Sequence, residues 1–239
     1  MQINWYAIKM TVLLGLVVFL YCFASARNSA RKITKVQIEI EDNSQPFLTN
    51  ETVSKLLIQN KHKVTSVPKD SLDLNSLEFA LNSNPIIKDA QVYVSVNNGF
   101  TVKVEQKKPI ARVQTNASYY IDDDGSFMPL SANFSARVPL VTGNVEKQDL
   151  TTVYRVAKKV FDDAVLKKYV VEIHQDANQN ISLKMRQYGF WVELGNTEQM
   201  EKKFNNLKAF YKKALNDKTL DTYATVNLRF DNQVVCTKK

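Results

Sequence analysis

An apolar run near the N-terminus, residues 10–26, constrains this chain more than any other feature. It reads MTVLLGLVVFLYCFASA and lies between two charged residues, Lys9 and Arg27. A helix needs about 20 apolar residues to cross a bilayer, and the run approaches that length when the residues from Trp5 onward are added. The sequence therefore predicts a transmembrane helix over residues 9–26, preceded by a short tail, residues 1–8.

Two alternatives for this segment stay open from the residues alone. Ala24-Ser25-Ala26 has the A-x-A pattern of a signal peptidase site, so the run is also compatible with a cleavable export signal. Cys22 is a candidate for lipid attachment, although the bulky Tyr21 stands where such sites carry a small residue. The length of the run and its charged flanks favour the membrane anchor.

The residues after the run, 27–33, form a basic neck that contains Arg27, Arg31 and Lys32. Basic side chains close to an anionic bilayer gain about 1 kcal/mol each, so these three are candidate ligands of lipid headgroups. The positive-inside rule would place the bulk of the chain in the cytoplasm, whereas the short tail and the signal-like end of the run favour export. Charge alone leaves the orientation open.

Composition indicates a folded chain beyond the neck. Hydrophobic residues make up 44% of the 239 residues, which is enough to build a core, and the net charge is +8. That charge suits an anionic membrane surface or nucleic acid and does not decide between them. The two cysteines, Cys22 and Cys236, lie far apart in the sequence, and we expect no disulfide between them.

Residues 34–107 have the pattern of a compact domain with the element order β-α-α-β-β. A strand over residues 35–40 alternates apolar and polar side chains, and a helix follows with Thr49 as its N-cap. Asn75 and Glu78 have the spacing of a capping box for a second helix. Residues 88–106 then read as a hairpin that turns at Asn97-Asn98-Gly99.

Residues 108–239 predict a second domain, a mixed or antiparallel β domain with flanking helices, so the fold class is α+β. Short strands come first, and an amphipathic helix runs from Leu150 to Ala164. A three-stranded meander covers residues 169–195, and another helix follows from Met200 to Leu215. One side of that helix is basic and is expected to face solvent: Lys202, Lys203, Lys208, Lys212 and Lys213.

The acidic segment at Asp122-Asp123-Asp124-Gly125 is the first candidate for chemistry. It fails the spacing of an EF-hand loop, and adjacent acids on a strand point to opposite faces, which suits paired acid–base work poorly. Asp-Gly between apolar runs predicts a hairpin turn, in which Asp122, Asp124 and Gly125 have a structural role. His62 and His174 have no ligands at metal-binding spacing, so we expect no catalytic site, metal or cofactor.

The last short strand, around Val234-Val235-Cys236, is expected to lie at the edge of a sheet. An edge strand offers unpaired backbone groups to a partner strand. The alternative is an edge covered by the chain's own helix. The candidate partner-binding residues are Phe230, Gln233, Val234, Val235, Cys236 and Thr237.

Several motifs in this order resemble the FtsQ/DivIB family of bitopic bacterial cell-division proteins. Residues 84–113 are similar to the second half of the POTRA domain of that family, and YYIDDDG at 119–125 to its Y-x-I-D-x-x-G segment. Residues 190–211 and 223–235 are similar to its last helix and its final strands. The chain departs from the family pattern at Asn227, which replaces an acid, and at Gln106-Lys107, which replaces Glu-Arg.

The resemblance implies a non-enzymatic scaffold in the cell inner membrane. Residues 1–8 would be cytoplasmic, the bulk of the chain periplasmic, and the protein enriched at the division septum. It would link early septal proteins to two small coiled-coil bitopic partners (FtsB/FtsL-like) and to the septal synthase complex. It would bind neither nucleic acid nor a small-molecule substrate, and the acidic segment would be a structural hairpin.

Two other functional classes remain as alternatives to this scaffold. A POTRA-containing periplasmic factor for outer-membrane protein assembly or secretion would share the first domain. Such a factor is expected to carry repeated POTRA units or a barrel, and the sequence shows neither pattern. A periplasmic cell-wall enzyme would need catalytic carboxylates, and no recognisable motif in this sequence indicates them.

Overall fold

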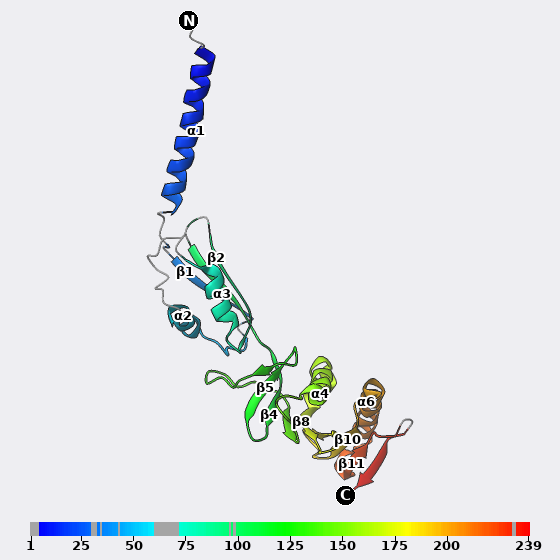
Figure 1. Ribbon diagram of the computed structural model, residues 1–239. Coiled ribbons are helices and arrows are strands. Elements are labelled where there is room, and N and C mark those ends of the chain that lie inside the picture. The colour runs from blue at the N-terminus through cyan, green and yellow to red at the C-terminus, as the bar shows by residue number, and fades with distance from the viewer. Residues whose placement is uncertain are drawn as a thin grey trace. The chain divides into compact units, whose positions relative to one another are not determined.

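The computed structural model describes residues 5–29, 33, 35–42, 44–59, 72–95, 97, 99–230 and 233–239. The chain divides into two compact units, Met1–Gln106 and Lys107–Lys239 (Figure 1). The first contains the apolar helix and a small α/β domain, and the second is built on one large sheet. The predicted α+β class is confirmed: an N-terminal apolar helix precedes a small α/β domain and a C-terminal β domain with flanking helices.

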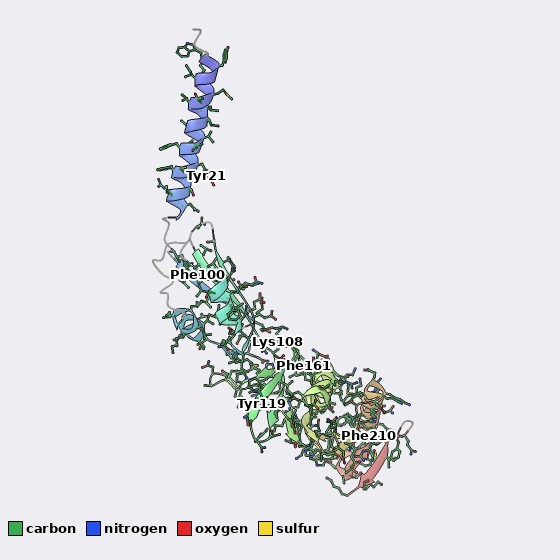
Figure 2. The ribbon with its side chains drawn as sticks, in the orientation of Figure 1. Tyr21, Phe100, Lys108, Tyr119, Phe161 and Phe210 are labelled. Carbon is green, nitrogen blue, oxygen red and sulfur yellow. The ribbon has the colours of Figure 1, made fainter. Side chains whose placement is uncertain are left out.

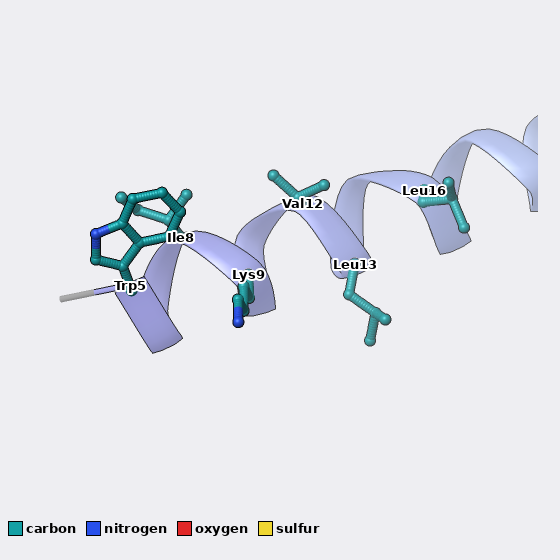
Figure 3. Close-up of a pocket in the computed structure, with 6 residues that line it drawn as sticks. All are labelled: Trp5, Ile8, Lys9, Val12, Leu13 and Leu16. Carbon is teal, nitrogen blue, oxygen red and sulfur yellow. The ribbon is translucent and has the colours of Figure 1, made fainter.

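Helix α1, Trp5–Ser29, is long and apolar enough to cross a membrane. The candidate span within it, Ile8–Asn28, has a mean hydropathy of 2.1, and none of it is buried inside the structure. Along its first turns, Ile8, Val12 and Leu16 project from one side while Lys9 and Leu13 project from another (Figure 3). Apolar side chains therefore surround the helix, as a lipid environment requires.

The helix extends beyond the predicted span of residues 9–26 at both ends. Arg27, predicted in the neck, lies in the last helical turn, where a cation interacts favourably with the helix dipole. Ile33, also predicted in the neck, is 4% exposed and packs in the core of the α/β domain. Arg31, Lys32 and His62 lie outside the described residues.

The α/β domain has the predicted order of elements: β1 Lys35–Glu41, α2 Asn50–Gln59, α3 Leu74–Asn82, β2 Ile87–Val94 and β3 Gly99–Gln106. Its sheet has the order β1-β3-β2, with β3 parallel to β1 and antiparallel to β2. Phe100, Val102 and Val104 of this central strand are fully buried. Figure 2 labels Phe100 within the domain. Val53 from α2 and Leu77 from α3 pack in the same core.

The two helices of this domain begin at different kinds of cap. Thr49 caps α2 as predicted, because its hydroxyl accepts a hydrogen bond from Thr52 N at 3.2 Å. The capping box predicted for α3 at Asn75 and Glu78 is wrong, since Asp73 is the N-cap and its carboxylate accepts from Ser76 N. The Glu78 carboxylate instead accepts from the backbone N–H of Val92 in β2, at 3.4 Å.

The second unit contains a nine-stranded sheet of order β12-β11-β10-β9-β8-β7-β4-β5-β6. The strands are β4 Pro109–Gln114, β5 Ser118–Asp122, β6 Phe127–Met128, β7 Leu140–Gly143, β8 Val170–Gln175, β9 Ile181–Met185, β10 Trp191–Gly195, β11 Tyr223–Asn227 and β12 Val235–Lys238. The pairs β4/β7, β7/β8 and β10/β11 are parallel, and the other pairs are antiparallel. The sheet is therefore mixed.

Helices α4, Thr151–Asp162, and α6, Met200–Asn216, lie on the same side of this sheet (Figure 1). Their apolar side chains share one core with the sheet, and Val153 and Phe204 are fully buried there. The single helix predicted from Leu150 to Ala164 is interrupted at Asp163, which caps the short helix α5, Ala164–Tyr169, through Val165 N and Leu166 N. The hydrogen bond from Lys208 to this carboxylate, at 2.8 Å, holds the pKa of Asp163 below its ordinary value.

Lys203 departs from the solvated lysine face predicted for α6. Its side chain is only 8% exposed, and its ammonium donates to the backbone oxygen of Asn196 at 2.9 Å and to Asn196 Oδ1 at 2.8 Å. The lysine ties the start of α6 to the segment that follows β10. The other four lysines of the predicted face are exposed or half-buried.

Gly143 tests how tightly the parallel pair β7/β8 is packed. Its φ is +92°, and a Cβ at this position would lie 2.0 Å from the backbone oxygen of Gln175 in β8. We expect Gly143→Ala to lower the free energy of unfolding by more than about 2 kcal/mol, because backbone strain and a backbone clash add. Urea unfolding of the full chain in detergent measures the change.

Gly189→Ala is the matched control for this substitution. Gly189 also has a positive φ, +65°, but nothing lies within 4 Å of its added Cβ. Its substitution should cost only the backbone term, about 1 kcal/mol. Equal losses in the two variants would contradict a steric requirement at Gly143.

Candidate partner-binding edge

Strand β12 ends the nine-stranded sheet, next to β11. The two strands are antiparallel, with Asn227 opposite Val235, Val226 opposite Cys236 and Thr225 opposite Thr237. The strand begins one residue later than the predicted Val234 and continues to Lys238, so Gln233 and Val234 precede it. Its outer side is a sheet edge in the described part of the chain.

The hydrogen bonds of neighbouring residues determine which backbone groups of β12 point outward. Leu228 N donates to Glu193 O at 2.9 Å, so it is not available to the residue before Val235. Because opposite residues of an antiparallel pair alternate between hydrogen-bonded and non-hydrogen-bonded pairs, Val235 and Asn227 then form a hydrogen-bonded pair. The backbone N–H and C=O of the next residue, Cys236, point to the opposite side of β12. The N–H and C=O groups of Cys236 and Lys238 are therefore directed away from β11.

The side chains along this edge fall into two groups. Phe230 and Val235 are 48% and 40% exposed, and Gln233 and Thr237 are exposed as well. Val234 and Cys236 are half-buried and pack against the core of the second unit. Burial raises the pKa of the Cys236 thiol, which disfavours the reactive thiolate. The edge thus combines outward backbone groups with two exposed apolar side chains.

The opposite end of the sheet is formed by the acidic segment, where β5 and β6 make a hairpin. Asp122 Oδ1 accepts from Ser126 N at 2.6 Å and from Asp124 N at 3.2 Å. Gly125 has a φ of +82°, and its N–H donates to Asp122 O at 3.1 Å. These contacts hold a turn and leave Asp122 1% exposed, so it is not accessible to a substrate.

Asp122 also forms a buried ion pair that sequence reasoning missed. Lys107 Nζ lies 2.8 Å from Asp122 Oδ2, and the lysine side chain is 18% exposed. The same ammonium donates to Phe127 O at 3.4 Å, so it contacts both strands of the hairpin. The first residue of the second unit is thereby fixed to the β5/β6 hairpin.

Of the two histidines considered for chemistry, His174 is described by the structure and His62 is not. His174 Nδ1 lies 3.0 Å from the hydroxyl of Thr142. Among the described residues, no group of three His, Cys, Asp or Glu side chains is arranged to hold a metal ion.

We expect Asp122→Ala to destabilise the second unit by about 3 kcal/mol, because it removes two backbone hydrogen bonds and leaves Lys107 without its buried partner. Urea unfolding of the full chain measures this loss. Asp124→Ala is the control, since Asp124 is exposed, and its loss should stay below about 1 kcal/mol. Similar losses in both variants would contradict the structural role of Asp122.

Comparisons with known proteins match both units of the chain. Residues 108–237 match the family model described as FtsQ/DivIB, C-terminal related, and residues 31–105 match the POTRA-like domain. The cell division protein DivIB of Clostridium tetani is 23% identical over 192 residues, which cover 72% of this chain and 67% of the relative. The cell division protein FtsQ of Geotalea daltonii is 22% identical over 180 residues, covering 70% and 64%.

The cell division protein FtsQ of Salinibacter ruber is 27% identical over 168 residues, which cover 64% of each chain. This chain therefore spans about two thirds of the length of the curated relatives it matches. The match to the C-terminal model extends over more than half of the chain and includes the whole nine-stranded sheet except the last residue of β12. The family predicted from the motifs is confirmed: the chain belongs to the FtsQ/DivIB family of cell division proteins.

Proposed function

We propose that this chain is a non-enzymatic scaffold of the division machinery, anchored by α1 in the inner membrane and enriched at the septum. Its second unit would bind a partner by accepting one more strand at β12. The observation that carries the proposal is the outer edge of β12, where the backbone groups of Cys236 and Lys238 are directed outward and the side chains of Phe230 and Val235 are exposed. Family membership supports a role in division.

The partners we propose are membrane proteins of the same machinery: two small coiled-coil bitopic proteins (FtsB/FtsL-like) and, through them, the septal synthase complex. The chain would connect these to proteins that arrive earlier at the septum. An added strand gains affinity from main-chain hydrogen bonds, each worth about 0.5–1.5 kcal/mol net. Covering Phe230 and Val235, which are about half exposed, adds about 1 kcal/mol each.

The proposed orientation places both domains in the periplasm and residues 1–8 in the cytoplasm. Basic residues after the span oppose this orientation, but large domains are exported largely regardless of such a bias. Arg27, in the last turn of α1, would lie at the outer headgroups together with Arg31 and Lys32 of the neck. These three residues are proposed to contact anionic lipid, at about 1 kcal/mol per charge.

Cys236→Pro tests the added strand directly. Proline removes an outward N–H and places its ring where the partner strand would pair, and proline is tolerated at a sheet edge when its N–H side faces out. We expect partner affinity to fall about tenfold or more, since one hydrogen bond is lost and steric exclusion is added. Binding of the full-length variant to detergent-solubilised partners, measured by biolayer interferometry, gives the change.

Cys236→Val is the matched control, because it keeps the N–H and fills a similar half-buried position. It should bind the partners as the unchanged protein does. Thr237→Pro should act differently: Thr237 faces β11 by the same alternation, so its substitution unpairs β12 and lowers stability. Unchanged affinity of Cys236→Pro would refute binding by strand addition at this edge.

Depletion of the protein in cells tests the role in division. An N-terminal fluorescent fusion should form a band at midcell, and depletion of the native copy should give filaments. The Cys236→Val variant should restore septation and Cys236→Pro should not. A uniform envelope signal with normal septation after depletion would contradict the proposal, whatever the binding measurements show.

A further inference from the structure

The face of the nine-stranded sheet opposite α4 and α6 is covered near β5 and hollowed over β8 to β11. Near β5, the segment after β6 lies over Tyr120, whose hydroxyl contacts Ser135 at 3.2 Å and accepts from Ala136 N at 3.1 Å. Farther along the same face, a groove of about 410 Å³ opens over β8 to β11. Its lining residues are Glu172, His174, Ser182, Trp191, Glu193 and Thr225.

The strand register explains why this part of the face is hollow. Ser182 of β9 lies between His174 of β8 and Glu193 of β10, and it is smaller than either neighbour. The larger side chains therefore form walls, and the serine forms the floor. In the next row Trp191 lies opposite Thr225 of β11, so the indole closes one end of the groove.

Hydrogen bonds around the groove fix its polarity. The Thr142 hydroxyl donates its one hydrogen to Glu172 Oε1 at 2.9 Å. The contact of 3.0 Å between that hydroxyl and His174 Nδ1 must then be donated by the imidazole, which leaves His174 Nε2 as an acceptor in the neutral ring. Glu193 Oε2 accepts from Asn227 Nδ2 at 2.9 Å and forms a longer ion pair with Arg229, whose Nη2 lies 3.8 Å away.

The groove thus presents the Glu172 carboxylate, the Glu193 carboxylate with its long ion pair to Arg229, an imidazole acceptor and an indole ring, and none of its six lining residues is a Lys or Arg. Arg and Lys side chains carry donors only, and their cations bind carboxylates and the face of tryptophan. The surroundings have the opposite charge, because residues 107–239 contain 21 Lys and Arg against 15 Asp and Glu. An acidic groove in a basic unit is complementary to a cationic group and not to an anionic one.

We propose that this groove binds the guanidinium or ammonium group of an Arg or Lys side chain on a partner polypeptide. The chain's own Lys184 shows the attraction, since its Nζ lies 5.5 Å from the centroid of the Trp191 ring. Lys184 is opposite both Glu172 and Trp191 in the sheet, at the rim of the groove. The site is separate from the β12 edge and does not depend on strand addition there.

The full chain in nanodiscs of zwitterionic lipid allows a direct test. The protein has two tryptophans, so Trp5→Phe leaves Trp191 as the single indole, and its fluorescence reports on the groove. N-acetyl-arginine amide is the probe, and N-acetyl-citrulline amide is its neutral isostere. We expect a saturable change with arginine, half-complete at about 1–10 mM, and none with citrulline.

Variants in the same background separate the groups that bind. Glu172→Gln and Glu193→Gln should each weaken binding about two- to fivefold, and Glu146→Gln, an exposed carboxylate elsewhere in the unit, should not. Lys184→Met should tighten binding about two- to fivefold, because it removes a competing cation. Cys236→Pro should bind the probe normally, so failure of this site and failure of the β12 edge are distinguishable.

Three results would overturn the proposal. One is no response of Trp191 to the arginine probe, and a second is an equal response to citrulline. The third is unchanged affinity in the Glu172→Gln/Glu193→Gln double variant. A response to N-acetylglucosamine without one to arginine would assign the groove to a sugar and would likewise exclude the cationic side chain.

Discussion

An open β-sheet ends in two edge strands whose outer backbone groups have no strand partner. The two edge strands of the second unit, β6 and β12, differ in how far the chain protects them from pairing with another strand. At β6 the edge is only two residues long, Phe127 and Met128, and its hairpin is held by Asp122 and the buried ammonium of Lys107. In the first unit, side chains of α3 satisfy backbone groups of the edge strand β2: Glu78 accepts from Val92 N, and Asn82 donates to Ala90 O. The four-residue β12 instead carries the exposed Val235, and the exposed Phe230 precedes the strand, which suits an interface better than a protected edge.

Local patterns predicted most elements because periodicity and turn chemistry act over a few residues. The β3 alternation and the Thr49 cap are of this kind. The errors have more than one cause. At α3 a competing local cap, Asp73, is used, while the Glu78 carboxylate accepts from Val92 N in β2. At α6 the ammonium of Lys203 is held inside the protein by Asn196, seven residues earlier in the chain. The parallel pairing of β7 with β8 and of β10 with β11 could not be predicted either, since no local signal specifies which distant strands become neighbours.

At the candidate edge, too, the existence of the strand could be predicted from local residues, whereas the direction of its backbone groups could not. Apolar residues close to the C-terminus were enough to predict a strand there and to place it at an edge. The direction of its backbone groups depends on Leu228 donating to Glu193, and on the irregular register between Tyr223 and Thr225. Those contacts make Cys236, and not Val235, the residue whose N–H is directed outward, and they involve strands that a single sequence does not pair.

The edge and the groove lie on one sheet, yet one added strand cannot reach both. Neighbouring strands are about 4.8 Å apart, so a strand added beyond β12 would lie about 14 Å from β10, where Trp191 and Glu193 are found. That separation exceeds the reach of one extended side chain. Occupation of both sites therefore requires a second segment of the same partner, lying across the open face, or a second partner. In either arrangement the rigid sheet fixes the distance between the two contacts, which is the property a scaffold needs.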